Sequence, residues 1–105
     1  MCNFTVLAQS ENGYVVYCPD CTMFQFAFGT TLLKVPVHYF ERITNEVHEL
    51  TVNTTQVVHP NVKNITVPLE EGILMCLTFT ELMKLEALLN EAVAIFETHR
   101  ILQNI

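Results

Sequence analysis

The spacing of hydrophobic residues changes twice along the chain, from every second residue to every third or fourth. Alternation over 24–28 gives way to helical spacing over 36–49, and a strand pattern over 73–79 gives way to helical spacing over 80–101. Side chains alternate between the two faces of a strand, whereas a helix returns to the same face every 3.6 residues. Each change therefore predicts a strand followed by a helix, and the pair of changes favours an α+β fold.

Turn residues divide the strand segments into hairpins. Asn12-Gly13 separates two β-type runs and is typical of a type I′ turn, in which both central residues have positive φ. We therefore predict a hairpin over 4–18, and Gly29 and Gly72 mark two further turns. The expected architecture is an antiparallel sheet of five to six strands with two helices packed on one face.

The length of 105 residues suits a single domain spanning 1–105. Its expected parts are a Cys-bearing hairpin (1–23), a first hairpin-helix unit (24–50), a connector (51–64) and a second hairpin-helix unit (65–105). Residues 32–43 match residues 74–85 in hydrophobic pattern at an offset of 42. Two explanations stay open: duplication of a hairpin-helix unit, or the general likeness of any strand followed by a helix.

Charge and hydropathy exclude two classes of partner. Eleven Asp and Glu outnumber five scattered Lys and Arg, so the clustered basic face that nucleic-acid binding needs is missing. The apolar runs are far shorter than a membrane-spanning helix, and the N-terminus lacks the features of a secretory signal. We expect a cytoplasmic protein without nucleic-acid or membrane partners.

The last helix carries a hydrophobic band wider than the stripe that one sheet face covers. The mean hydropathy of +0.33 also suggests that a second subunit covers part of the apolar surface. We predict a homodimer to which this helix or an open sheet edge contributes. The band consists of Leu82, Leu85, Leu88, Leu89, Ala92, Val93, Ile95 and Phe96.

Cys18 and Cys21 form a Cys-x-x-Cys pair with a proline between them, a spacing that suits two thiolates on one zinc ion. Cytoplasmic cysteines stay reduced, so metal binding or catalysis is a better explanation for them than a disulfide. The expected hairpin register brings Cys2 beside Cys21. The sequence thus predicts a structural zinc site formed by Cys2, Cys18 and Cys21.

The fourth zinc ligand is left open by the sequence. Any histidine offers an imidazole nitrogen, and His59, in the expected connector, is the most mobile candidate. Cys76 lies in an apolar strand, and we expect it to fill the core. The four histidines are His38, His48, His59 and His99.

Catalytic signatures are weak. A redox Cys-x-x-Cys normally opens a helix whose N-terminus lowers the thiol pKa, but the residues after Cys21 follow a strand pattern. No glycine-rich phosphate loop, Gly-x-Ser-x-Gly or His-Glu-x-x-His occurs. No catalytic residue is therefore assigned.

Several stretches resemble a family of short uncharacterised proteins from Bacteroidota-type bacteria, known only as a domain of unknown function. They are Cys2-Asn3, Glu11-Asn12-Gly13-Tyr14, Cys18-x-x-Cys21, Phe24-Gln25-x-Ala27-Phe28-Gly29-Thr30-Thr31 and Glu81-Leu82-x-x-Leu85-x-x-Leu88-Leu89. The resemblance implies a bacterial cytoplasmic protein and supports treating Cys2, Cys18 and Cys21 as a set. It implies no activity.

The function expected from these features is a small non-catalytic binding or assembly module with an unknown protein partner. A structural zinc at the N-terminal cysteines would stabilise it. The alternative is a metal- or thiol-dependent enzyme or redox sensor that uses Cys18 and Cys21.

Overall fold

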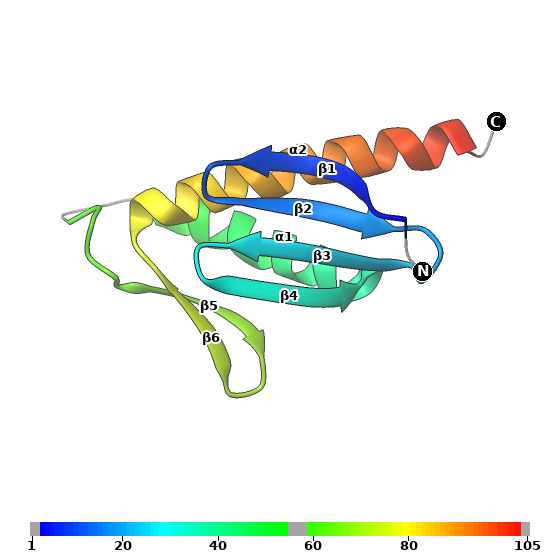
Figure 1. Ribbon diagram of the computed structural model, residues 1–105. Coiled ribbons are helices and arrows are strands. Elements are labelled where there is room, and N and C mark those ends of the chain that lie inside the picture. The colour runs from blue at the N-terminus through cyan, green and yellow to red at the C-terminus, as the bar shows by residue number, and fades with distance from the viewer. Residues whose placement is uncertain (1–2, 55–58, 104–105) are drawn as a thin grey trace.

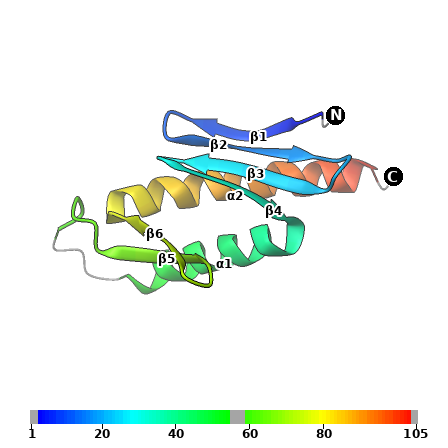
Figure 2. The same ribbon diagram turned by 60° about the horizontal axis from the view of Figure 1, so that its bottom comes forward.

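A computed structural model describes residues 3–54 and 59–103 of the chain (Figure 1). The first four strands are β1 (Thr5–Ser10), β2 (Gly13–Cys18), β3 (Met23–Phe28) and β4 (Thr31–Pro36). They are followed by α1 (Val37–Asn53), β5 (Ile65–Glu70), β6 (Ile73–Leu77) and α2 (Phe79–Gln103). Both helices lie on the same side of the β1–β4 sheet (Figure 2).

The strands form two antiparallel sheets. The first has the order β1-β2-β3-β4, and the second contains β5 and β6 alone. The predicted α+β class is confirmed, but the single sheet of five to six strands is wrong. Strand β5 packs against α1 instead of pairing with β4. Side chains from β4, α1 and the β5–β6 hairpin line the space between the two sheets.

The first hairpin turns one residue earlier than predicted. Ser10 pairs with Gly13, so the turn consists of Glu11 and Asn12. Positive φ occurs, among the described residues, only at Thr22, Gly29 and Gly72, so the type I′ prediction is also wrong. Gly13 is needed for a steric reason, because a Cβ at this position would lie 1.9 Å from the carbonyl oxygen of Ala27 on β3.

Helix α1 begins at Val37, one residue after the predicted start at Pro36, which ends β4 opposite Met23 and precedes the helix in an extended conformation. It extends to Asn53, four residues beyond the predicted end. Thr54 and residues 59–64, the described parts of the expected connector outside α1, contain no strand. Helix α2 is also slightly longer than the predicted 80–101.

A capping box formed by Thr78 and Glu81 stands at the start of α2. The Glu81 N–H donates to Thr78 Oγ1 (3.0 Å), and the Thr78 N–H donates to Glu81 Oε1 (2.9 Å). Lys63 Nζ also donates to Glu81 Oε1, at 2.8 Å. The Lys63 hydrogen bond, followed by the Thr78 N–H, lowers the pKa of the Glu81 carboxyl below its ordinary value.

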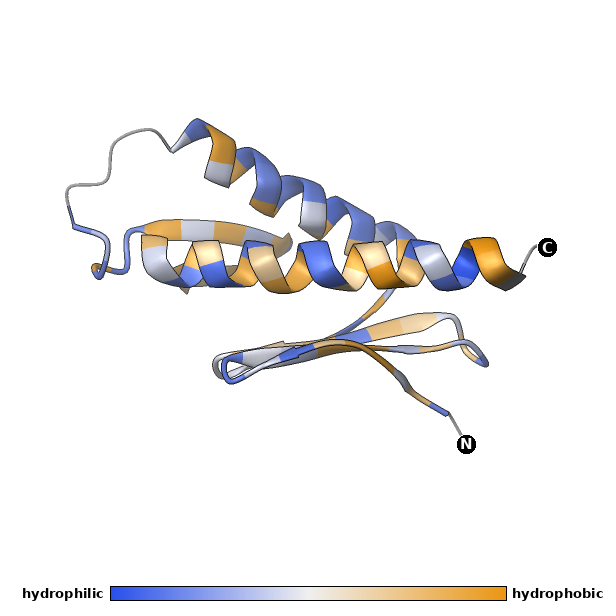
Figure 3. Cartoon of the chain, turned by 90° about the horizontal axis from the view of Figure 1, so that it is seen from above, coloured by the Kyte–Doolittle hydropathy of each residue, from blue (hydrophilic) through white to orange (hydrophobic). Residues whose placement is uncertain are grey.

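The core lies between the sheet and the helices. The rings of Phe24 on β3 and Phe40 on α1 stack at 4.0 Å, while the Tyr17 ring packs on Phe24 at a tilt and the Phe96 ring packs on it edge-on. Helix α2 lies between the sheet and α1 in the view of Figure 3 and packs against both. Most of its wide hydrophobic band is therefore covered within the chain. The buried members are Leu82, Leu85, Leu88, Leu89 and Ala92.

The chain contains two consecutive hairpin-helix units, β3–β4–α1 and β5–β6–α2. The offset of 42 relates Val37 to Phe79, the first residues of the two helices. It also relates Met23 to Ile65, the first residues of the two hairpins. Duplication and the general likeness of any strand followed by a helix both stay open as explanations.

Candidate functional site

The outer face of the β1–β4 sheet is the side away from both helices and from the β5–β6 hairpin (Figures 2 and 3). Cross-strand partners share a face, so the paired residues identify its members. One row across the sheet contains Val6, Val16, Gln25 and Lys34. A second row contains Gln9, Tyr14, Ala27 and Leu32.

This face carries exposed hydrophobic side chains. Val6 and Leu32 are 58% and 56% exposed, and Phe4, which precedes β1, is 47% exposed. Near the middle of the sheet, Gln25 Nε2 donates to the Tyr14 hydroxyl at 3.1 Å, which satisfies both groups. Apart from Lys34, the outer face therefore combines an apolar surface with neutral polar groups.

Strands β1–β4 contain almost none of the charged residues of the chain. None of the eleven Asp and Glu residues belongs to strands β1–β4, and Lys34 is their only Lys or Arg. The carboxylates lie instead in turns, in the β5–β6 hairpin and on the two helices. A chain with a net charge of −6 thus has one broad face without a carboxylate.

The Cys-x-x-Cys pair forms the turn between β2 and β3. Cys18 ends β2 and is buried, Cys21 is exposed in the turn, and Met23 begins β3 opposite Cys18. Thr22, next to Cys21, has a φ of +54°. This conformation is a strained one for a β-branched residue, and such strain is often found at functional sites.

The N-terminal segment crosses the outer face close to this turn. Phe4 lines a small pocket together with Cys21, Met23 and Gln25. Cys2 lies outside the described residues, two positions before Phe4.

The structure does not bring His59 to the cysteines. Pro60, next to His59, accepts a hydrogen bond from the Thr80 N–H at the start of α2 (3.2 Å). His99, near the other end of α2, lines a pocket with Pro19 and Thr22 of the cysteine turn. Thr80 and His99 lie about 28 Å apart along the axis of α2, at the rise of an α-helix. No sequence signal favoured His99, because its proximity to the turn depends on how α2 crosses the sheet.

Within the described residues, no three His, Cys, Asp or Glu side chains come together in a group that could hold a metal ion. Cys18 and Cys21 are therefore, with Cys2 undescribed, only part of the predicted ligand set.

Cys76 was expected in the core, and this prediction is wrong. It faces outwards on β6, opposite Thr66, while its neighbours Met75 and Leu77 are buried. The reason is that only one face of the β5–β6 hairpin is covered, so alternate residues of an apolar strand are exposed. The Cys76 Sγ contacts the Lys63 carbonyl oxygen at 3.8 Å.

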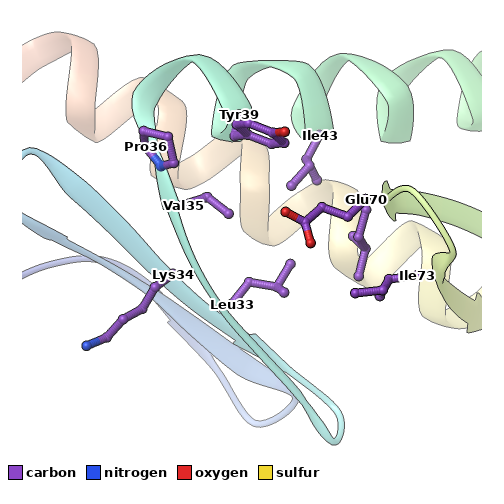
Figure 4. Close-up of a pocket in the computed structure, with 9 residues that line it drawn as sticks. Leu33, Lys34, Val35, Pro36, Tyr39, Ile43, Glu70 and Ile73 are labelled. Atoms are coloured by element: carbon purple, nitrogen blue, oxygen red, sulfur yellow. The ribbon is translucent and has the colours of Figure 1, made fainter.

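A pocket separates β4 from the β5–β6 hairpin (Figure 4). Its walls are mostly apolar and include Leu33, Val35 and Ile43. The Glu70 carboxylate points into the space, whereas the Lys34 side chain points away from it. The pocket thus lies in the space between the two sheets. The Lys34 amine lies on the outer face of the β1–β4 sheet.

These features define a small α+β protein with an antiparallel meander that is covered by helices on one face only. The chain belongs to a family of unknown function, DUF6686, whose model matches residues 1–103. No curated protein and no solved structure matches the chain significantly. Neither helix in the described residues has the length and apolar character that crossing a bilayer demands.

Proposed function

We propose that the chain is a small non-catalytic binding or assembly module that contacts its protein partner through the outer face of the β1–β4 sheet. The observation that carries this proposal is the absence of every carboxylate from these four strands in an acidic chain. The buried centre of a protein interface is depleted of charged residues and enriched in aromatic residues and Met. The outer face, with Tyr14, Met23 and the adjoining Phe4, has this composition.

An affinity capture from host-cell extract tests this face. The bait is the full chain, either wild type or with Leu32→Asp, which places a carboxylate on the outer face at a site that is already 56% exposed. Leu74→Asp is the matched control, since Leu74 is 60% exposed on the β5–β6 hairpin. We expect the wild type and Leu74→Asp to retain the same protein and Leu32→Asp to lose it. Equal retention by all three would contradict the proposal.

A structural zinc at the turn between β2 and β3 is our second proposal. Its support is the strained Thr22 next to Cys21, and the position beside Cys21 of Phe4, which follows Cys2 by two residues in the sequence. The fourth ligand stays open, because Cys18, Cys21 and His99 do not come together in a group that could hold a metal ion. A bacterial cytoplasm, where thiols remain reduced, is the compartment that suits such a site.

Thermal unfolding tests the zinc proposal. If the metal joins the N-terminus to this turn, its binding energy contributes to folding. A strong chelator should then lower the melting temperature of the wild type, and Cys18→Ser should lower it in the presence of zinc. His59→Ala and Cys76→Ala should leave the zinc content of the purified protein unchanged.

An unchanged melting temperature with chelator, together with no zinc in the purified protein, would contradict a structural zinc. Rapid thiol labelling of Cys18 and Cys21 in that metal-free protein would instead favour the alternative, a thiol-dependent enzyme or redox sensor.

A further inference from the structure

The pocket between β4 and the β5–β6 hairpin has room for one small molecule (Figure 4). Its volume is about 150 Å³, and a cavity of this volume with aliphatic and aromatic walls accommodates a benzene ring. Strand β4, helix α1 and the hairpin contribute the walls, and most of the side chains in them are apolar. A ligand with an apolar body about the size of one ring therefore fits this space. The apolar residues include Leu33, Val35, Ile43 and Ile73.

Glu70 is the acidic group of the pocket, and its carboxylate points into the space (Figure 4). Among the described residues, the carboxylates that form ion pairs are those of Glu81, Glu86 and Glu97. No described Lys, Arg or His is thus paired with Glu70. Lys34 also lines the pocket, but its side chain points away from it. The pocket therefore offers a carboxylate to a cation that comes from outside the described chain.

Arg42 is not paired with Glu70, because other groups hold its guanidinium. Arg42 Nη2 donates to the Leu69 carbonyl oxygen at 2.8 Å, and its Cζ lies 4.5 Å from the centre of the Tyr39 ring. These contacts attach α1 to β5 at the residue before Glu70. They fix two walls of the pocket relative to each other. A ligand thus meets a preformed site, which reduces the ordering cost of binding.

We propose that this pocket binds a small organic ammonium ion. A neutral apolar ligand would cover part of the Glu70 carboxylate without pairing it, and an anion would be repelled by it. A metal ion needs several ligands, and the described residues contain no group of three His, Cys, Asp or Glu that could hold one. An ammonium group on a ring-sized apolar body matches both the carboxylate and the walls.

Benzylammonium is the probe that tests the proposal, because it joins a positive charge to a single ring. Titration of the isotope-labelled full chain, followed by NMR, measures its dissociation constant and identifies the residues whose signals shift. We expect shifts at Leu33, Ile43 and Ile73. Glu70→Gln keeps the shape of the side chain but removes its charge, and it should raise the dissociation constant roughly tenfold or more. Glu71→Gln is the matched control and should bind as the wild type does, since Glu71 is the neighbouring carboxylate but does not line the pocket.

A second variant tests the location of the ligand. Ile73→Phe enlarges a side chain that lines the pocket and is 50% exposed, so the change leaves the core intact. We expect it to fill part of the space and to weaken benzylammonium binding, while thermal melts verify that the variant is folded. Benzyl alcohol and benzoate carry the same ring without a positive charge, and both should bind the wild type roughly tenfold or more weakly than benzylammonium.

Several outcomes would overturn the proposal. They are the absence of benzylammonium binding, equal binding by the wild type and Glu70→Gln, and unchanged binding by Ile73→Phe. The amide of N-acetylated lysine is a further probe, which represents a lysine side chain of a partner protein. Weaker binding of this probe than of benzylammonium would support a free small molecule. Tighter binding would overturn it and assign the pocket to a lysine of the partner.

Discussion

Glu81 connects three separate parts of the chain through one carboxylate. It caps α2 together with Thr78, and it accepts a hydrogen bond from Lys63 in the segment before β5. The two contacts join the segments on either side of the β5–β6 hairpin, Lys63 before β5 and Thr78 after β6, to the start of α2. Because both contacts favour the ionised carboxylate, the pKa of Glu81 is lowered, and this has a consequence for stability.

Replacement of Glu81 by Gln should reveal that consequence. Gln can still accept the capping hydrogen bond, so the variant removes mainly the charge. The folded-state pKa lies below the ordinary 4.5, so the carboxylate stabilises the fold above that pH and loses its effect as the pH falls through the folded-state pKa. We expect Glu81→Gln to cost about 0.5 kcal/mol at neutral pH, a value reduced for the partial exposure of the pair.

Urea unfolding at neutral and acidic pH measures this difference. The gap between wild type and Glu81→Gln should close in acid, and Glu91→Gln is the control on the same helix. A gap that persists at low pH would show that the charge is not responsible.

The sequence was most informative about where the hairpins lie. The geometry of the first hairpin, however, was decided by the neighbouring strand β3. Asn-Gly indicated a turn, yet Gly13 belongs to β2 and allows the carbonyl of Ala27 to approach closely. Gly29, by contrast, has a φ of +59°, and no atom lies within 4 Å of the point that a Cβ would occupy there. Two glycines at similar hairpin ends are thus required for different reasons.

Alanine substitutions should separate these reasons. Gly13→Ala would force the first hairpin away from β3, and we expect a loss of about 3 kcal/mol in the free energy of unfolding. Gly29→Ala should cost only about 1 kcal/mol, the strain of a left-handed conformation. Denaturant unfolding of the two variants provides the comparison, and equal losses would contradict the steric role of Gly13.

One aromatic cluster joins the β1–β4 sheet to both helices. Phe24 on the central strand β3 contacts Phe40 of α1, Phe96 of α2 and Tyr17 of β2. Because the Phe24 ring contacts the sheet and both helices, its contribution to stability is not confined to one element. Its removal should therefore destabilise the entire fold.

We expect Phe24→Ala to lower the free energy of unfolding by about 3–5 kcal/mol. This is a large part of the total stability of a typical domain, which is about 5–15 kcal/mol. Leu74→Ala, at an exposed position, should change it by less than about 0.5 kcal/mol. Partial unfolding of Phe24→Ala that leaves one helix intact would contradict the global role of the cluster.

Most of the secondary structure was predictable because local rules determine it. The strand over 24–28 follows from alternation, α1 begins at the proline boundary, and α2 begins at the Thr78 and Glu81 capping box. These signals act between residues close in sequence. The absence of carboxylates from the first four strands is likewise a property of the sequence, although the face that these strands form is not.

Only the tertiary structure decided which strands share a sheet and which faces are covered. An apolar strand has the same pattern whether helices cover one of its faces or both, so the exposure of Cys76 could not be inferred. The position of His99 beside the cysteine turn, far from His59, likewise depends on the path of α2 across the sheet. Pairing and coverage arise from contacts between residues distant in sequence, and local periodicity carries no information about them.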